Sequence, residues 1–218
     1  MNAMGGINKR GVLLGVTGGI ATGKSTVARL LEEKGAPLVD FDELSRAVVE
    51  PGKEAWQEIV SFFGEEVLLP DRTLNRRKVS EIVFRDPAKR KRLESITHPR
   101  IHEEFRARVS AITSRDPGAI IQAAIPLLIE TNLQSLFDKI LLVYTPREVQ
   151  IRRLMDRDRI PEGMALSILA AQMPIEEKKA YADYIVDNSG PLEETASQVD
   201  EVWRDLLEYQ GTRKEGGS

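Results

Sequence analysis

The segment from residue 18 to residue 25 constrains this chain most, because it matches the pattern G-x-x-x-x-G-K-[ST] at every fixed position. Glycines in such a loop let successive backbone N–H groups approach an anion without a Cβ in the way. A helix that starts at Gly23 would point its free N–H groups and its positive dipole end at the same anion. The pattern therefore predicts a phosphate-binding loop between a strand and a helix.

Two side chains supply the chemistry of this loop. Lys24 would bring a full charge to the β and γ phosphates of a nucleotide, and the Ser25 hydroxyl is a hard oxygen ligand for Mg²⁺. The alternative is a glycine-rich turn without a ligand. The match follows an apolar segment and opens an amphipathic helix, which favours the nucleotide site. GTPases share the loop, but the sequence has no N-K-x-D element for guanine. The loop therefore predicts an ATP-dependent kinase of the P-loop class.

Short apolar segments alternate with helical patterns along much of the chain. Strands are expected at residues 12–16, 37–40, 119–125, 139–144 and 184–187. Buried parallel strands appear in sequence as nearly continuous apolar runs, and helices cover both faces of such a sheet. The predicted fold is an α/β, three-layer P-loop kinase fold with a five-stranded parallel sheet.

Residues 44–115 differ, because their pattern is helical and is interrupted by proline and glycine breaks. Further helices are expected at 147–157, 162–172 and 175–181, before a last helix that carries Val199, Trp203 and Leu206. The predicted division is a core of residues 11–43, 116–146 and 183–210, a helical insertion at 44–115 and a further helical region at 147–182. Residues 1–10 and 211–218 are expected to be flexible.

Composition narrows the class of partner. The chain has 218 residues, of which 41% are hydrophobic and 30% charged, with a net charge of −3, so a nucleic-acid partner is disfavoured. It has no cysteine, which excludes disulfides and thiol metal sites. The longest apolar stretch, residues 119–129, is shorter than the roughly 20 residues that a membrane span needs. We expect a soluble, cytoplasmic protein without a membrane partner, as a monomer or a weak homo-oligomer.

Two carboxylates follow the second predicted strand, at the edge of the sheet where α/β proteins bind ligands. One such carboxylate can take the proton of an acceptor hydroxyl or orient that hydroxyl, and another can hold the water shell of a metal, so Asp42 and, less strongly, Asp40 are candidates. The alternative is that either residue caps the next helix.

Arginines form a second candidate group. Gln150, Arg153 and Arg157 are spaced i, i+3 and i+7, so they lie on one stripe of a helix. Arginines on a mobile helix can enclose a transferring phosphoryl group and exclude water. The alternative is a solvated basic face paired with Asp156 and Asp158.

Two histidines have a spacing that can hold a metal. His98 and His102 are spaced i, i+4, but Pro99 stands between them at an expected helix start and no third ligand is evident. A metal is therefore not expected there, and His98 is assigned to the insertion.

Several separate blocks of sequence between Leu14 and about Gly190 resemble the dephospho-coenzyme A kinase family. The resemblance rests on residues 15–20 with 23–27, 39–42, 45–46, 48–52, 97–99, 126–128 with Glu130, Gln150 with Arg153, 171–172, 182–183 and 187–190. Each block alone is a weak signal, whereas their joint order and spacing are specific.

The resemblance implies transfer of the ATP γ-phosphate to the ribose 3′-hydroxyl of dephospho-coenzyme A, the last step of coenzyme A synthesis (EC 2.7.1.24), with Mg²⁺. It implies that the insertion binds the acceptor and that the helical region at 147–182 is a lid that carries arginine. The expected catalytic residues are Lys24, Asp42 and Arg153. The expected ATP-binding residues are Gly18, Gly19, Ile20, Ala21, Thr22, Gly23, Lys24, Ser25, Thr26, Arg157 and Asn188. Acceptor binding is expected from Asp42, Arg46, His98, Pro126 and Leu127, and metal binding from Ser25, with Asp40 on its water shell.

The loop departs from the family at two positions. Ala21 stands where the family usually has a further glycine, and Thr22 replaces the more familiar serine. Ala21 is expected to fit only with a negative φ, which would alter the loop slightly.

Two other functions remain open on the sequence. One is another small-molecule P-loop kinase, acting on a nucleotide or a sugar acid. The long insertion and the blocks at 97–99 and 126–128 favour dephospho-coenzyme A as the acceptor. The other is a nucleotide-binding switch or degenerate regulator, against which the intact Lys24, Ser25 and Asp42 argue.

Overall fold

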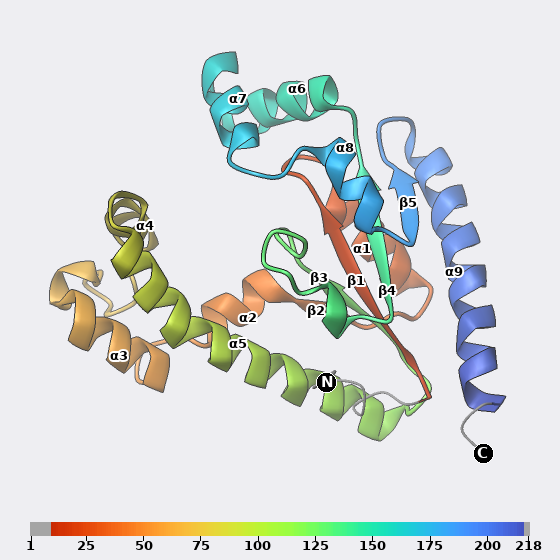
Figure 1. Cartoon of the computed structure of the whole chain (residues 1–218), viewed down its shortest axis with the longest axis horizontal. Coiled ribbons are helices and arrows are strands. Elements are labelled where there is room, and N and C mark those ends of the chain that lie inside the picture. The colour runs from red at the N-terminus through yellow and green to blue at the C-terminus, as the bar shows by residue number, and fades with distance from the viewer. Residues whose placement is uncertain (1–9, 216–218) are drawn as a thin grey trace. The chain divides into compact units, whose positions relative to one another are not determined.

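The computed structural model describes residues 10–215, and within them a five-stranded parallel sheet forms the centre of the fold. Its strands are β1 (Val12–Gly18), β2 (Leu38–Asp40), β3 (Ile120–Ala124), β4 (Lys139–Tyr144) and β5 (Tyr184–Asp187). They lie in the order β2-β3-β1-β4-β5, with β1 in the middle (Figure 1). The predicted α/β class and all five strands are confirmed.

Helices fill the segments between and after the strands. They are α1 (Lys24–Glu33), α2 (Phe41–Ala47), α3 (Glu54–Phe63), α4 (Arg76–Arg85), α5 (Pro87–Arg115), α6 (Arg147–Asp158), α7 (Glu162–Ala170), α8 (Ile175–Lys178) and α9 (Leu192–Glu215). Short 3-10 turns occupy Glu65–Val67, Gln134–Leu136 and Lys179–Tyr181. Within residues 10–215, no helix is long and apolar enough to cross a membrane.

Two expectations about helix ends are wrong. Helix α9 continues to Glu215, so residues 211–215 are helical rather than flexible. Helix α7 ends at Ala170, two residues before the expected end, and residues 171–174 lead to Pro174 at the start of α8. The other segments expected to be flexible, residues 1–9 and 216–218, lie outside the described residues.

Pro99 lies inside α5, so the expected helix start at this residue is also wrong. A proline in a helix interior removes one backbone N–H and normally breaks the helix. Here polar side chains bond neighbouring carbonyls: the Arg100 guanidinium donates to Ile96 O at 2.8 Å, and Thr97 Oγ1 donates to Leu93 O at 2.9 Å. Neither bond reaches Ser95 O, the carbonyl that the Pro99 N–H would have bonded, yet the helix continues to Arg115.

The main core lies between the sheet and the helices α1 and α9. Strand β1 is buried along its whole length, and Val27 and Leu31 of α1 and Val199 and Leu206 of α9 are fully buried in the same cluster. On β1, Gly15 leaves room for large neighbours, because an added Cβ would lie 2.7 Å from Leu128 and 2.9 Å from Phe137. Burial on this scale fixes β1, and with it the start of the loop that follows.

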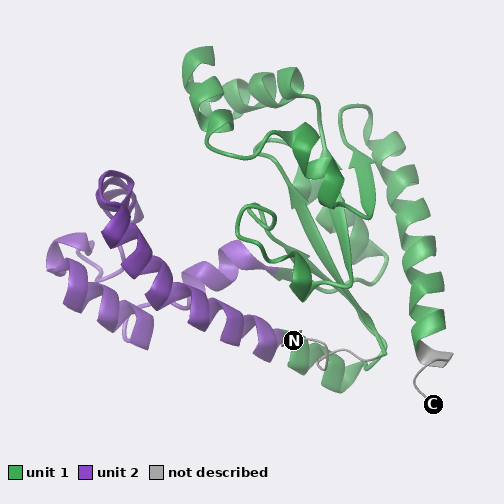
Figure 2. Ribbon diagram, in the orientation of Figure 1, with its two compact units in different colours: residues 1–39, 109–218 green, residues 40–108 purple. Residues whose placement is uncertain are grey.

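The chain divides into two compact units (Figure 2). One comprises residues 1–39 and 109–218, of which 10–39 and 109–215 are described, and it includes the predicted lid range 147–182. The other comprises residues 40–108, close to the expected insertion at 44–115. This second unit has its own core, formed by Val48, Val49, Ala55, Ile59, Phe63, Val67, Val79 and Ile96. The roles expected of these regions stay predictions.

Candidate active site

The predicted phosphate loop joins β1 to α1, as its motif requires. Gly23 has a φ of 83°, and a Cβ at this position would collide with the side-chain nitrogen of Asn188. Two independent constraints therefore demand glycine here. Helix α1 begins at Lys24 with no side chain bonded to its first N–H groups. Uncapped N–H groups at a helix start bind an anion such as phosphate.

Ala21 has a φ of 58°, so the expectation of a negative φ is wrong. The left-handed region costs an alanine roughly 1–2 kcal/mol relative to right-handed backbone. Such a conformation persists only where surrounding contacts impose it. The loop therefore keeps its conformation at Ala21 in spite of the substitution, and contacts elsewhere must hold it.

Buried polar side chains beneath the loop supply those contacts. The Thr22 carbonyl accepts hydrogen bonds from Asn188 Nδ2 at 2.8 Å and from Thr145 Oγ1 at 3.2 Å. Thr195 Oγ1 donates to Asn188 Oδ1 at 3.0 Å, and Asn188 is only 7% exposed. Thr22 Oγ1 in turn donates to the Gly19 carbonyl at 2.9 Å. Asn188, which we expected to bind ATP, thus supports the backbone of the loop.

The two reactive groups of the motif are free of partners within the described part of the chain. Lys24 is half-buried and forms no ion pair or hydrogen bond with a described side chain. Ser25 is exposed, and its hydroxyl has no hydrogen-bond partner among the described residues. An exposed, uncommitted hydroxyl at the start of α1 fits a Mg²⁺ whose remaining ligands are water and phosphate oxygens.

The stripe predicted on α6 divides into three different environments. Gln150 is buried, and its Nε2 donates to Thr145 O at 2.8 Å. Arg153 is half-buried and donates to Asn188 O at 2.8 Å. Arg157 is exposed and forms two bonds to Asp158, at 2.7 and 2.9 Å, which raise the pKa of the guanidinium. Arg157 thus matches the alternative of a solvated side chain paired with an aspartate. Arg153 instead belongs to the hydrogen-bond network beneath the loop.

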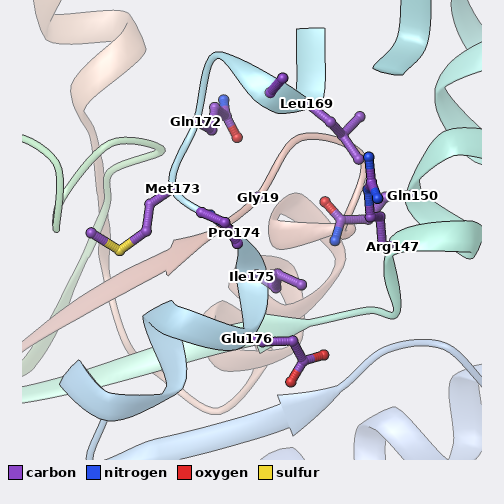
Figure 3. Close-up of a pocket in the computed structure, with 10 residues that line it drawn as sticks. Gly19, Arg147, Gln150, Leu169, Gln172, Met173, Pro174, Ile175 and Glu176 are labelled. Atoms are coloured by element: carbon purple, nitrogen blue, oxygen red, sulfur yellow. The ribbon is translucent and has the colours of Figure 1, made fainter. Parts of the chain in front are cut away.

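A cavity of about 440 Å³ opens beside Gly19 (Figure 3). Its lining comes from Gly19, from α6, from the end of α7, from the start of α8 and from the segment between these two; the residues are Gly19, Arg147, Gln150, Leu169, Ala170, Gln172, Met173, Pro174, Ile175 and Glu176. Gln172 reaches the loop itself, because its Oε1 accepts the Ile20 N–H at 3.0 Å. The sequence placed Gln172 in a family block without a role, and this contact joins residues 152 positions apart.

The predicted acceptor residues of the second unit gather around α2. Asp40 caps this helix by accepting the Asp42 N–H at 2.7 Å, as the capping alternative proposed. The Asp42 side chain is exposed. Arg46 is exposed on the same helix. Burial lowers the pKa of Arg76, the charge of Arg46 lowers it further, and Asp42 opposes both. Asp42, Arg46 and Arg76 are thus close enough to interact, and Arg76 was missed.

Arg76 also lines an apolar pocket of about 280 Å³ within this unit. Helices α2 to α5 and two residues between them, Val49 and Leu74, supply its lining, which is Ser45, Val49, Ile59, Leu74, Arg76, Val79, Ser80, Val83, Leu93, Thr97 and Ile101. A guanidinium at an apolar pocket suits a ligand that carries both an anionic group and an aliphatic part. The asparagine cap at Asn75, which accepts the Lys78 N–H, was the local signal that places Arg76 first on α4.

The remaining predicted residues lie elsewhere. His98 is exposed beside half-buried His102, whose pKa is lowered by burial and by the nearby charges of His98 and Arg106. Among residues 10–215, no cluster of three or more His, Cys, Asp or Glu side chains could hold a metal. Pro126 and Leu127 follow β3 in the first unit; the Pro126 carbonyl accepts Thr17 Oγ1 at 3.4 Å, and Leu127 is 41% exposed.

The sheet order, the loop after β1 and the uncapped start of α1 define a P-loop kinase fold. Solved structures agree. The chain resembles the structure of TT1252 from Thermus thermophilus, with a TM-score of 0.77 and 33% identity, over 90% of this chain and 98% of that one. It also resembles a dephospho-CoA kinase from Campylobacter jejuni, with a TM-score of 0.67 and 28% identity, over 89% of this chain and 96% of the other.

Sequence comparison identifies the family within that class. The family model for dephospho-CoA kinase matches residues 12–194. A dephospho-CoA kinase of Syntrophus aciditrophicus is 44% identical over 96% of this chain and 90% of its own, and one of Geobacter metallireducens is 47% identical over 90% and 98%. The chain belongs to the dephospho-CoA kinase family, whose reaction is the final step of coenzyme A biosynthesis.

Proposed function

We propose that the protein transfers the γ-phosphoryl group of ATP to the ribose 3′-hydroxyl of dephospho-CoA, which gives CoA and ADP. The observation that carries this proposal is the loop itself: a glycine held at φ 83°, an uncapped helix start and an unpaired lysine, in a member of this family. In the reaction, the acceptor oxygen bonds to the γ-phosphorus while the bond from this phosphorus to the β–γ bridging oxygen breaks.

The donor half uses groups of the first unit. The N–H groups at the start of α1 and the charge of Lys24 would hold the β and γ phosphates and stabilise the charge that develops on them. When bound through Ser25, Mg²⁺ supplies further neutralisation of the phosphate oxygens. The partner-free state of both side chains within the described chain supports this assignment.

The acceptor half would use mainly groups of the second unit. Asp42 would orient the 3′-hydroxyl and take its proton, which then passes to solvent. Arg46 and Arg76 would bind the pyrophosphate of the acceptor, because arginine matches phosphate oxygens in geometry and charge. His98, Pro126 and Leu127 stay proposals as further acceptor contacts, and Asp40 stays one for the water shell of Mg²⁺. Since Asp40 already accepts the Asp42 N–H, it would have one carboxylate oxygen left for that water.

A panel of acceptors tests this function directly. ADP release would be measured with dephospho-CoA, adenosine monophosphate and gluconate, each with ATP and Mg²⁺ present. We expect turnover with dephospho-CoA alone. Turnover with adenosine monophosphate or gluconate and none with dephospho-CoA would identify a different small-molecule kinase. ATP binding without transfer to any acceptor would favour a nucleotide-binding switch.

Arg153 offers a second test, because its guanidinium bonds Asn188 O and also lies on the predicted lid. We expect Arg153→Ala to reduce phosphoryl transfer and to increase ATP hydrolysis without acceptor, since the site would exclude water less well. Both rates would be measured as ADP release with and without dephospho-CoA. The matched control is Arg152→Ala, which removes an exposed neighbour on the same helix. An unchanged enzyme would return Arg153 to a structural role.

A further inference from the structure

The Gln172 side chain contacts the phosphate loop at one of its backbone N–H groups. Ile20 N–H belongs to the loop that is built to present N–H groups to phosphate, yet it donates to a side chain from the segment after α7. The next residue is Ala21, which is held at an unfavourable φ of 58°. A hydrogen bond at Ile20 therefore acts beside the most strained residue of the loop.

The segment that carries Gln172 is itself anchored. The N–H of Met173 donates to Glu130 Oε1 at 3.2 Å, and the same oxygen lies 2.8 Å from the Lys178 ammonium. Lys178 is fully buried, and the angle of this close ion pair does not meet hydrogen-bond geometry. Burying a charge is costly unless a partner neutralises it, so the Glu130–Lys178 pair stays together. It thereby fixes the backbone next to Gln172.

A second amide contacts the loop from the opposite side. Gln150 Oε1 lies 2.6 Å from the position that a Cβ on Gly19 would take, and Gln150 is held by its bond to Thr145 O. In the view of Figure 3, Gln150 and Gln172 flank the loop at Gly19. The first half of the loop is therefore placed between α6 and the α7–α8 segment. Among residues 10–215, Gln172 is the residue whose side chain accepts a backbone N–H of this first half, and substitution can remove that acceptor.

We propose that Gln172 is a positioning residue: by accepting the Ile20 N–H, it makes the nucleotide-binding conformation of the phosphate loop depend on docking of the α7–α8 segment. Gln172 need not touch ATP for this role. The segment follows helices that the proposed function treats as a lid, so nucleotide affinity becomes coupled to the state of that region. Because this coupling acts on ATP binding, it does not depend on which acceptor the protein phosphorylates.

Three variants test the proposal. Gln172→Leu removes the acceptor oxygen at similar size, and Gln172→Glu retains an oxygen that can accept the Ile20 N–H. Gln210→Leu is the matched control, because the Gln210 side chain likewise bonds the main chain, although as a donor, from Nε2 to the Gly118 carbonyl before the start of β3. The measurements are the Kd of ATP without acceptor, the exchange rate of the Ile20 amide by NMR, the KM of dephospho-CoA and the Tm.

We expect Gln172→Leu to weaken ATP binding by about tenfold and to speed exchange of the Ile20 amide, because one hydrogen bond near a strained residue is lost. The KM of dephospho-CoA and the Tm should stay close to those of the parent. Compared with the parent at the same salt concentration, Gln172→Glu should recover most of the affinity at about 1 M salt, where its repulsion of the triphosphate is screened. Gln210→Leu should bind ATP normally.

Three results would overturn the proposal. One is an unchanged Kd of ATP in Gln172→Leu. Another is a parallel rise in both substrate constants together with a fall in Tm, which indicates general structural damage. The third is a failure of Gln172→Glu to recover affinity at high salt. If no acceptor were turned over at all, the Kd of ATP and the amide exchange would still decide the role of Gln172.

Discussion

Lys24→Ala is expected to lower turnover by on the order of 10³-fold, with the fold intact. In phosphoryl transfer the protein does little covalent chemistry, so positioning and charge stabilisation supply nearly all of the rate. Lys24 is half-buried, begins α1 and has no described partner, so its charge is available to the phosphates. Loss of this charge should affect kcat most, because negative charge on the phosphoryl oxygens develops toward the transition state.

The measurement is steady-state ADP release with dephospho-CoA, with circular dichroism to verify folding. Lys34→Ala is the matched control, because Lys34 lies at the other end of α1 and pairs with Asp200. We expect the control to keep parent-like kcat and KM. Normal turnover in Lys24→Ala would remove the phosphate loop from the mechanism.

Asp42→Asn is expected to lower kcat by roughly 10²–10⁴-fold while the Kd of ATP stays nearly unchanged. The amide has almost the same shape but cannot take a proton. Asp42 is exposed, and its backbone N–H rather than its side chain takes part in the cap of α2, so the substitution leaves that cap in place. The split between kcat and ATP affinity is thus the signature of a proton acceptor.

Glu43→Gln provides the control, since Glu43 is the exposed neighbouring carboxylate in the first turn of α2. Its kinetics should match those of the parent, measured as kcat and KM for both substrates. If Asp42→Asn lost ATP affinity and kcat to the same degree, Asp42 would hold metal or structure instead of a proton.

Local patterns predicted the parts of this fold that depend on local physics. The five strands are apolar runs, and such a run predicts a buried strand whichever strand it pairs with. The phosphate loop is a contiguous motif whose glycines and lysine lie within eight residues. Helix α1 ends at Glu33, and Gly35 just beyond it has a φ of 100°, the left-handed conformation that glycine commonly takes after a helix. In each case the deciding interactions lie within a few positions of one another.

Long-range contacts explain what the sequence did not reveal. Ala21 tolerates a positive φ because residues more than 120 positions away hold its neighbours. Pro99 lies inside the 29-residue helix α5, although a proline in the sequence normally predicts a helix boundary. Gln172 looks like any polar residue near a helix end until the fold places it against Ile20.

The two hydrogen bonds to the Thr22 carbonyl also determine the direction of the N–H of Gly23, which belongs to the same peptide unit. The carbonyl of Thr22 and the N–H of Gly23 belong to one planar trans unit, so they point in opposite directions. By holding the oxygen inward, Asn188 and Thr145 aim this N–H outward before any ligand arrives. The conformational entropy of that orientation is therefore lost when the protein folds, and ATP meets a donor that needs no rearrangement.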